Sequence, residues 1–175
     1  MASGGTTARV RPTHTPENWL EMPFDVAIRR DADIPARLLA SRFLDEQLCL
    51  VAAPKLLAEQ TADGALPLIS AETRPGELEA WFAAAGTSGQ PPCSFPHFYI
   101  ALEACLAGKG ALVAPTMNAE ELIARGDLVE PSPAVRVKGP GYHVAYDPAS
   151  PRAAAAAAFI NWLTGPAMVF QQNAP

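Results

Sequence analysis

The chain has 175 residues, of which 49% are hydrophobic and 18% charged, so it is long enough to bury one sizeable core or the cores of two small lobes. Its net charge of −5, with 13 basic and 18 acidic residues, argues against a chain that binds nucleic acid by itself, because phosphate contacts need clustered Lys and Arg. Three cysteines without a C-x-x-C pair indicate a reducing compartment and not a disulfide framework. Because no segment has the pattern of a signal peptide or a membrane span, we expect a soluble cytoplasmic protein.

The first half of the chain alternates short extended segments with short helices. Apolar and β-branched residues predict extended segments over 10–15, 24–29, 38–44, 48–53 and 66–70. One helical turn is expected at 17–21, and Pro54 predicts the start of a short helix. The spacing of Leu78, Trp81 and Phe82 predicts an amphipathic helix over 76–85.

The second half continues this alternation. The expected elements are helices over 94–107, 118–125 and 151–163 and strands over 111–114 and 142–146. Ser94 is expected to cap the first of these helices, and Asn118 and Glu121 have the spacing of a capping box. Strands that alternate with helices predict an α/β fold with a largely parallel sheet.

Several segments share their order and spacing with one family of bacterial proteins. They are FDVAIRR at 24–30, LDEQLCLVAAP at 44–54, ALEACLAGKGALVAP at 101–115, the E-L and G-D-L-V within 121–129, the strand at 141–146 and FINWL at 159–163. Over residues 10–163 the chain resembles the effector-binding domain of LysR-type transcriptional regulators, in the style of the subgroup related to the glycine-cleavage activator.

The resemblance implies a periplasmic-binding-protein type II fold, with two α/β lobes, two crossover strands and a cleft between the lobes. Residues 10–53 and 148–163 would form lobe I and residues 54–147 lobe II, with flexible ends at 1–9 and 164–175. The family's DNA-binding helix-turn-helix, and the first strand and helix of lobe I, have no counterpart in the sequence. We therefore expect a truncated regulator whose incomplete lobe I exposes apolar surface.

The resemblance also places an effector site between the lobes, where helix N-termini suit small, often anionic molecules. The implied residues are Thr13, Thr15, Ser70, Ala71, Glu72, Ser94, Phe95 and Pro96. Hydroxyl groups at these positions would orient a carboxylate, whereas Glu72 would repel an anion. The structural alternative is that Ser94 only caps its helix and Thr13 only fills a strand.

Other candidate sites are weaker. His14, His97 and His143 are too scattered for a metal site, and neither a metal nor a cofactor is expected. Cys93 and His97 have the spacing of a thiol–imidazole pair, whereas Cys105 lies on an apolar helix stripe and is expected to pack in the core.

Two short motifs have structural interpretations. The sequence from Gly108 to Gly110 follows a helix and opens a strand, which is the reverse of a phosphate-binding loop. Arg29 and Arg30 stand at a strand end where they could face the cleft, but a solvated pair is the preferred interpretation.

Three functions remain open. The first is an effector-sensing and dimerisation module of a LysR-type regulator, which is not an enzyme, forms a homodimer or tetramer in the full-length protein, contacts DNA only through the missing domain and has no membrane partner. The second is a solute-binding protein of a transport system, which shares the fold class but needs an export signal. The third is a small thiol enzyme that uses Cys93 and His97.

Overall fold

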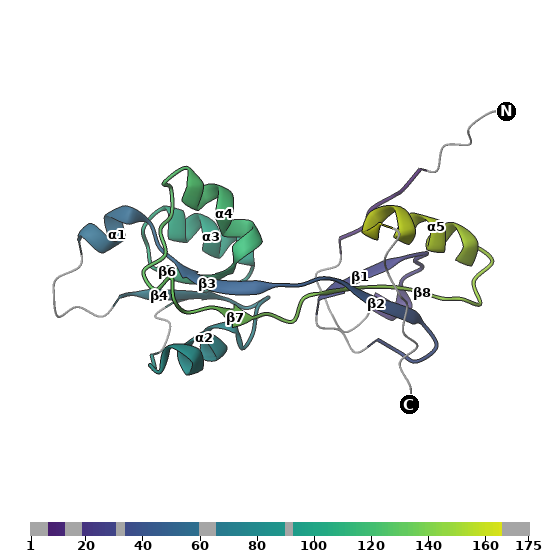
Figure 1. The fold of residues 1–175 in the computed structure, drawn as a ribbon, viewed down its shortest axis with the longest axis horizontal. Helices are drawn as coiled ribbons and strands as arrows, with labels where there is room; N and C mark the ends of the chain where they lie inside the picture. Colours follow the sequence, from purple (N-terminus) through teal and green to yellow (C-terminus); the bar gives the residue numbers. More distant parts are fainter. Residues whose placement is uncertain (1–6, 13–18, 31–33, 60–65, 90–92, 166–175) are drawn as a thin grey trace.

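The computed structural model describes residues 7–12, 19–30, 34–59, 66–89 and 93–165, and these form two sheets in separate lobes (Figure 1). Lobe I contains a three-stranded sheet and lobe II a five-stranded sheet. The chain passes from lobe I to lobe II over residues 45–46 and returns over residues 139–141. The expected two-lobed α/β fold is confirmed.

Lobe I has an antiparallel sheet with the strand order β1–β8–β2, and helix α5 packs against β8. The elements are η1 (Trp19–Glu21), β1 (Ala27–Arg30), β2 (Leu39–Leu44), β8 (Tyr142–Tyr146) and α5 (Ala153–Thr164). One face of the sheet buries Ala27, Ala40 and Ala145 together with Leu38. Because successive side chains of a strand point to opposite faces, the fully buried Val144 belongs to the other face.

Lobe II has the strand order β5–β4–β6–β3–β7, with α3 and α4 on one face of the sheet and α2 on the other (Figure 1). The strands are β3 (Gln47–Val51), β4 (Leu68–Ala71), β5 (Cys93–Phe95), β6 (Ala111–Pro115) and β7 (Val137–Lys138). The helices are α1 (Pro54–Ala58), α2 (Glu77–Ala85), α3 (Phe98–Leu106) and α4 (Thr116–Ala124). Cys49 and Val51 of β3 pack with α3 and α4, whereas Leu48 and Leu50 pack with α2, so this strand is buried on both faces.

The parallel strands β4, β5 and β6 end on the side of lobe II that faces lobe I. Strand β6 ends at Pro115, which pairs with Leu48 beside the first connection. Because β4 and β5 run parallel to β6, the helices that follow these three strands also begin on this side (Figure 1). The first residues of α2, α3 and α4 therefore lie at the junction of the lobes.

The two connections between the lobes are hydrogen-bonded to each other. Leu44 pairs with Tyr142 in lobe I, and the N–H of Gly139 donates a hydrogen bond of 2.9 Å to the carbonyl oxygen of Glu46. A Cβ atom on Gly139 would lie 2.4 Å from a carboxylate oxygen of Glu46, so a larger residue here would have to displace that carboxylate.

Strand direction and lobe boundaries differ from the prediction. Strands β3 and β7 are antiparallel to their neighbours, and the sheet of lobe I is antiparallel throughout, so the sheet is not largely parallel. Strand β3 lies in lobe II and β8 in lobe I, whereas the predicted boundaries at 53 and 147 assigned each to the other lobe. Each connection carries the chain from a strand of one sheet straight into a strand of the other, which no local pattern marks.

Two predicted helix caps are also wrong. Ser94 lies in β5, and α3 begins only at Phe98, whose N–H donates to the Thr73 hydroxyl at 3.1 Å. Asn118 lies inside α4, which begins at Thr116 directly after β6.

Several predictions fall partly outside the described residues. Residues 10–12 of the extended segment expected at 10–15 form no strand, and residues 13–15 are not described. The flexible ends expected at 1–9 and 164–175 fall mostly on residues 1–6 and 166–175, which are not described either.

Candidate functional site

The predicted residues of lobe II come together at the ends of β4 and β5. Ser70 pairs with Ser94, and Ala71 pairs with Phe95, across two neighbouring parallel strands. The N–H of Glu72 donates a hydrogen bond of 2.8 Å to the carbonyl oxygen of Phe95, which extends the ladder by one residue. Ser94 and Glu72 are exposed and Ser70 is half-buried, so the polar side chains here are accessible.

The other predicted residues add little to this arrangement. Pro96 is exposed in the turn between β5 and α3. Thr13 and Thr15 lie outside the described residues, so their place in the site stays a prediction.

Four charged side chains from three parts of the chain form what we term the interlobe ion cluster: Arg30, Glu46, Arg74 and Glu77. Arg30 ends β1 in lobe I, Glu46 lies in the first connection, and Arg74 and Glu77 follow β4 in lobe II. Both arginines contact both carboxylates, so the cluster has equal numbers of positive and negative charges and ties lobe I to lobe II.

The geometry of the cluster is that of charge-assisted hydrogen bonds. Arg30 donates to Glu46 from Nε at 3.0 Å and from Nη2 at 2.8 Å, and Nη2 also donates to Glu77. Nη1 of Arg74 donates to Glu46 at 3.2 Å and to Glu77 at 3.0 Å. The Arg74 guanidinium also lies 4.2 Å from the centre of the Phe98 ring, close enough for a cation–π contact.

Burial affects the two carboxylates differently. The Glu46 side chain is fully buried, and burial raises its pKa, but the hydrogen bonds and charges of Arg30 and Arg74 outweigh burial and lower the pKa overall. Burial also raises the pKa of Glu77, and here the two arginines only partly offset it, so the pKa stays above its ordinary value. One oxygen of Glu77, Oε2, is buried without a hydrogen-bond partner in the structure, which fits a weakly compensated charge.

Sequence reasoning missed this cluster. The sequence favours a solvated pair for Arg29 and Arg30, but the Arg30 side chain is only 18% exposed and contacts two carboxylates. Three of the four contacts join residues 16, 28 and 47 positions apart, which no local spacing brings together; the fourth joins Arg74 to Glu77, three positions away. The available signals were the position of Arg30 at a strand end and the i,i+3 spacing of Arg74 and Glu77.

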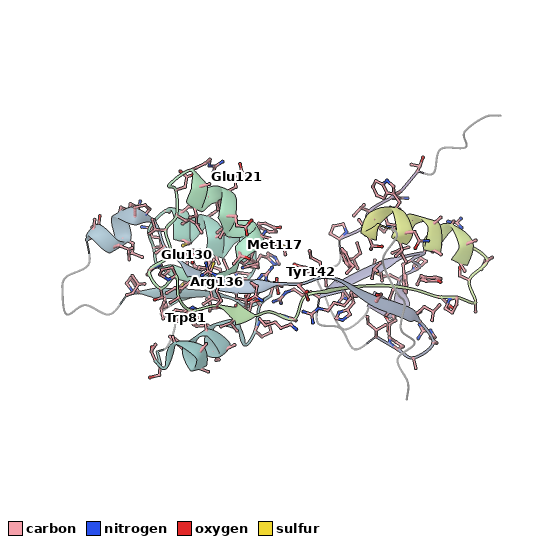
Figure 2. The ribbon with its side chains drawn as sticks, viewed as in Figure 1. Trp81, Met117, Glu121, Glu130, Arg136 and Tyr142 are labelled. Carbon is pink, nitrogen blue, oxygen red and sulfur yellow. The ribbon has the colours of Figure 1, made fainter. Side chains whose placement is uncertain are left out.

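Tyr142 is a second residue at the junction that sequence reasoning treated only as part of a strand. It is half-buried, begins β8 and lies where the second connection enters lobe I (Figure 2). It lies near Arg74, whose pKa burial lowers, but the charge of Glu77 and the hydrogen bond and charge of Glu46 outweigh burial and raise the pKa overall.

A shallow pocket of about 360 Å³ lies on lobe II beside the start of β3. Its lining comes from β3, α4 and the loop before β7, namely Gln47, Thr116, Glu120, Ile123, Glu130 and Arg136. Nη2 of Arg136 donates to Glu130 at 2.8 Å, and both side chains, labelled in Figure 2, line the pocket. The predicted effector residues do not line it.

Two of the three thiols lie in the core of the protein, as expected for Cys105. Cys49 and Cys105 are fully buried, and burial raises the pKa of each thiol to about 11, which keeps both protonated and unreactive. Cys93 is exposed on β5, with its Sγ 3.9 Å from the carbonyl oxygen of Ser94.

No group of three or more His, Cys, Asp or Glu is placed to hold a metal ion within the described ranges, which exclude His14. Of the helices in the described part of the chain, none is long and apolar enough to cross a bilayer.

Comparisons with known proteins agree on one family. The model of the family described as "LysR substrate binding domain" matches residues 7–166 of this chain. The effector domain of the transcriptional regulator AmpR of Pseudomonas aeruginosa is 24% identical with a TM-score of 0.67, over 80% of this chain and 70% of that one. The regulatory domain of CrgA, a LysR-type regulator from Neisseria meningitidis, is 20% identical with a TM-score of 0.66, over 87% of this chain and 81% of that one.

The AmpR effector-binding domain from Citrobacter freundii is 22% identical with a TM-score of 0.66, over 81% of this chain and 73% of that one. No curated protein sequence gives a significant match. The structural likenesses establish a periplasmic-binding-protein type II-like fold, and the family match covers most of the chain. The chain therefore belongs to the LysR substrate-binding domain family and is the effector-sensing domain of a LysR-type transcriptional regulator.

Proposed function

We propose that this domain binds its small-molecule effector at the junction of the lobes, against the polar ends of β4 and β5. The observation that carries the proposal is the pairing of Ser70 with Ser94, which sets two hydroxyl groups side by side where α2 and α3 begin. In open α/β sheets, ligands bind outside the carboxyl ends of the parallel strands. Thr13 and Thr15 would complete the site from lobe I.

The charges at the junction favour an effector with a low net charge. The guanidinium groups of Arg30 and Arg74 are already paired with Glu46 and Glu77. The exposed Glu72 adds a negative charge beside the two serines. A small monocarboxylate or an amino acid fits these charges better than a molecule with several negative charges, because Glu72 would repel the latter.

In the complete regulator, effector binding would change the arrangement of the lobes and thereby the contacts of a DNA-binding domain that lies outside this sequence. We propose that the regulator acts as a homodimer or tetramer in the cytoplasm, and that this domain performs no chemistry on its ligand.

A thermal-shift screen of amino acids and small carboxylates tests the proposal. A compound present at 100 times its dissociation constant should stabilise the domain by about 2.7 kcal/mol. The shift should fall in Ser70→Ala and Ser94→Ala and persist in Ser88→Ala, which removes an exposed hydroxyl from the loop after α2. A compound that stabilises all three variants equally would place the binding site elsewhere.

A further inference from the structure

Arg30 connects three parts of the molecule. It is the last residue of β1 in lobe I, and its guanidinium reaches Glu46 in the first connection and Glu77 at the start of α2 in lobe II. A side chain that bonds both the hinge and the opposite lobe has a position that depends on the angle between the lobes.

The acceptors of Arg30 are fixed independently of lobe I. Nη1 of Arg74 holds Glu46 at 3.2 Å and Glu77 at 3.0 Å, so both carboxylates are anchored from lobe II. Gly139 packs against Glu46 so closely that a Cβ atom would overlap its carboxylate. These contacts leave Arg30 as the member of the cluster that moves with lobe I.

We propose that the Arg30 guanidinium is a latch that fixes the angle between the lobes, and that its hydrogen bonds to Glu46 and Glu77 must rearrange when that angle changes. The inference rests on the proposed function, because the angle has a regulatory meaning only if an effector bound between the lobes alters it.

The chemistry of arginine suits this role. The guanidinium is planar and carries its donors in a rigid fork, and hydrogen bonds weaken steeply when donor and acceptor lose alignment. Nε and Nη2 of Arg30 both point at Oε2 of Glu46, at 3.0 and 2.8 Å, while Nη2 also faces Glu77. A rotation of lobe I would break these hydrogen bonds together, whereas an apolar contact is non-directional and would persist over a range of angles.

Interlobe distances measured by electron–electron double resonance test the latch. One spin label is placed on α5 through Ala158→Cys and the other on α4 through Ala124→Cys, both exposed positions, in a Cys93→Ser background. Cys49 and Cys105 are fully buried and escape labelling, which mass spectrometry verifies. The variants are Arg30→Lys, which keeps the charge but removes the fork, and Arg30→Met. The matched control is Arg152→Lys, because Arg152 pairs with Asp25 on the surface of lobe I alone.

Both Arg30 variants should broaden the distance distribution. Loss of one charge-assisted hydrogen bond should change the population of the parent interlobe angle, relative to other angles, by roughly tenfold or more. Arg152→Lys should give the parent distribution. If Arg30→Met does not fold, Arg30→Lys decides the matter. A parent-like distribution in the Arg30 variants that show a folded circular dichroism spectrum overturns the latch. No ligand is used, so failure of the thermal-shift screen contradicts the proposed function without affecting this result.

Discussion

Replacement of Glu46 by glutamine should cost far more stability than the same replacement of Glu77, although both carboxylates contact Arg30 and Arg74. Glu46 accepts from Arg30 at 3.0 and 2.8 Å and from Arg74 at 3.2 Å, and its side chain is fully buried. The pKa directions are opposite, lowered for Glu46 and raised for Glu77. Ionised Glu46 is therefore favoured in the folded state, whereas ionised Glu77 is not.

The expected magnitudes follow from these contacts. Removing one partner of a buried ion pair costs about 3–5 kcal/mol. A glutamine at position 46 keeps one acceptor oxygen but turns an NH₂ group toward a guanidinium, so we place Glu46→Gln at the lower end, about 3 kcal/mol. For a domain of this length that loss lowers the melting temperature by roughly 6–12 °C. Glu77→Gln should cost clearly less, because the charge it removes is one that burial disfavours, which offsets the weaker acceptor it leaves for Arg30 and Arg74.

The opposite pKa shifts of Glu46 and Glu77 predict how the stability differences change with pH. The stability contributed by Glu46 is fully present above its ordinary pKa and is lost as the pH falls through the lowered folded-state pKa. Ionised Glu77 instead costs stability, and this cost is complete above its raised folded-state pKa and absent below its ordinary pKa. The difference between the parent protein and Glu46→Gln should therefore be largest at neutral pH and shrink in acid.

Thermal and urea unfolding at neutral and acid pH, followed by circular dichroism, measures these differences. Glu121→Gln is the matched control, because Glu121 lies 84% exposed in a pair with Arg125 and should change stability by less than about 0.5 kcal/mol. Equal losses for Glu46→Gln and Glu77→Gln at neutral pH would refute the assignment of opposite roles. So would a Glu46→Gln deficit that does not shrink in acid.

Three further outcomes are expected. Gly139→Ala should displace the Glu46 carboxylate, since its Cβ would lie 2.4 Å from Oε2, and its cost in urea unfolding should not add to that of Glu46→Gln. A thiol reagent should modify Cys93 in the native protein and reach the buried Cys49 and Cys105 only after denaturation, a ratio that intact mass spectrometry reads directly. Ile160→Ala should destabilise the domain by about 2–5 kcal/mol because Ile160 is fully buried on α5, whereas Trp162→Ala, at a side chain that is 76% exposed, should cost much less.

Local patterns were sufficient to predict most elements. The stripe of Leu78, Trp81 and Phe82 is buried on one face of α2, and the helix bounds differ from the prediction by one residue. The strand predicted over 142–146 has the observed bounds. In both cases the periodicity of a few consecutive residues carries the information, and tertiary packing does not override it.

Strand direction was not predictable in the same way. A strand that is buried on both faces has the same apolar sequence in either direction, so Gln47–Val51 contains no sign that it opposes β6. The predicted start of α3 was wrong because the residues that decide it are also distant in the sequence. Ser is a residue type that often caps helices, but Ser94 lies in β5. The N–H of Phe98 at the start of α3 donates instead to the hydroxyl of Thr73, which is 25 residues away in the sequence.

The effector-site residues of lobe II stay a prediction from the resemblance, and the ion cluster that joins the lobes was not predicted. Only the family resemblance assigned Ser70 and Ser94 to one site, because the local sequence around Ser94 predicts a helix cap and not the strand β5 that pairs Ser94 with Ser70. The partners of Arg30 could not be predicted, because they depend on how two lobes meet.

The composition of the junction suggests why charges occupy it. A buried ion pair is weak evidence for stability, since apolar residues of similar volume often stabilise a protein as well or better. An ion pair differs from an apolar contact in that its hydrogen bonds are directional. The Arg30 guanidinium donates to Glu46 and Glu77 in one alignment, whereas apolar surfaces pack over a range of angles. A sensing domain must hold two lobes in a defined arrangement and still release them, and a hydrated alternative exists for each charge when the lobes separate. Within the cluster, Glu77 adds this direction at a cost in stability, because burial disfavours its ionised form.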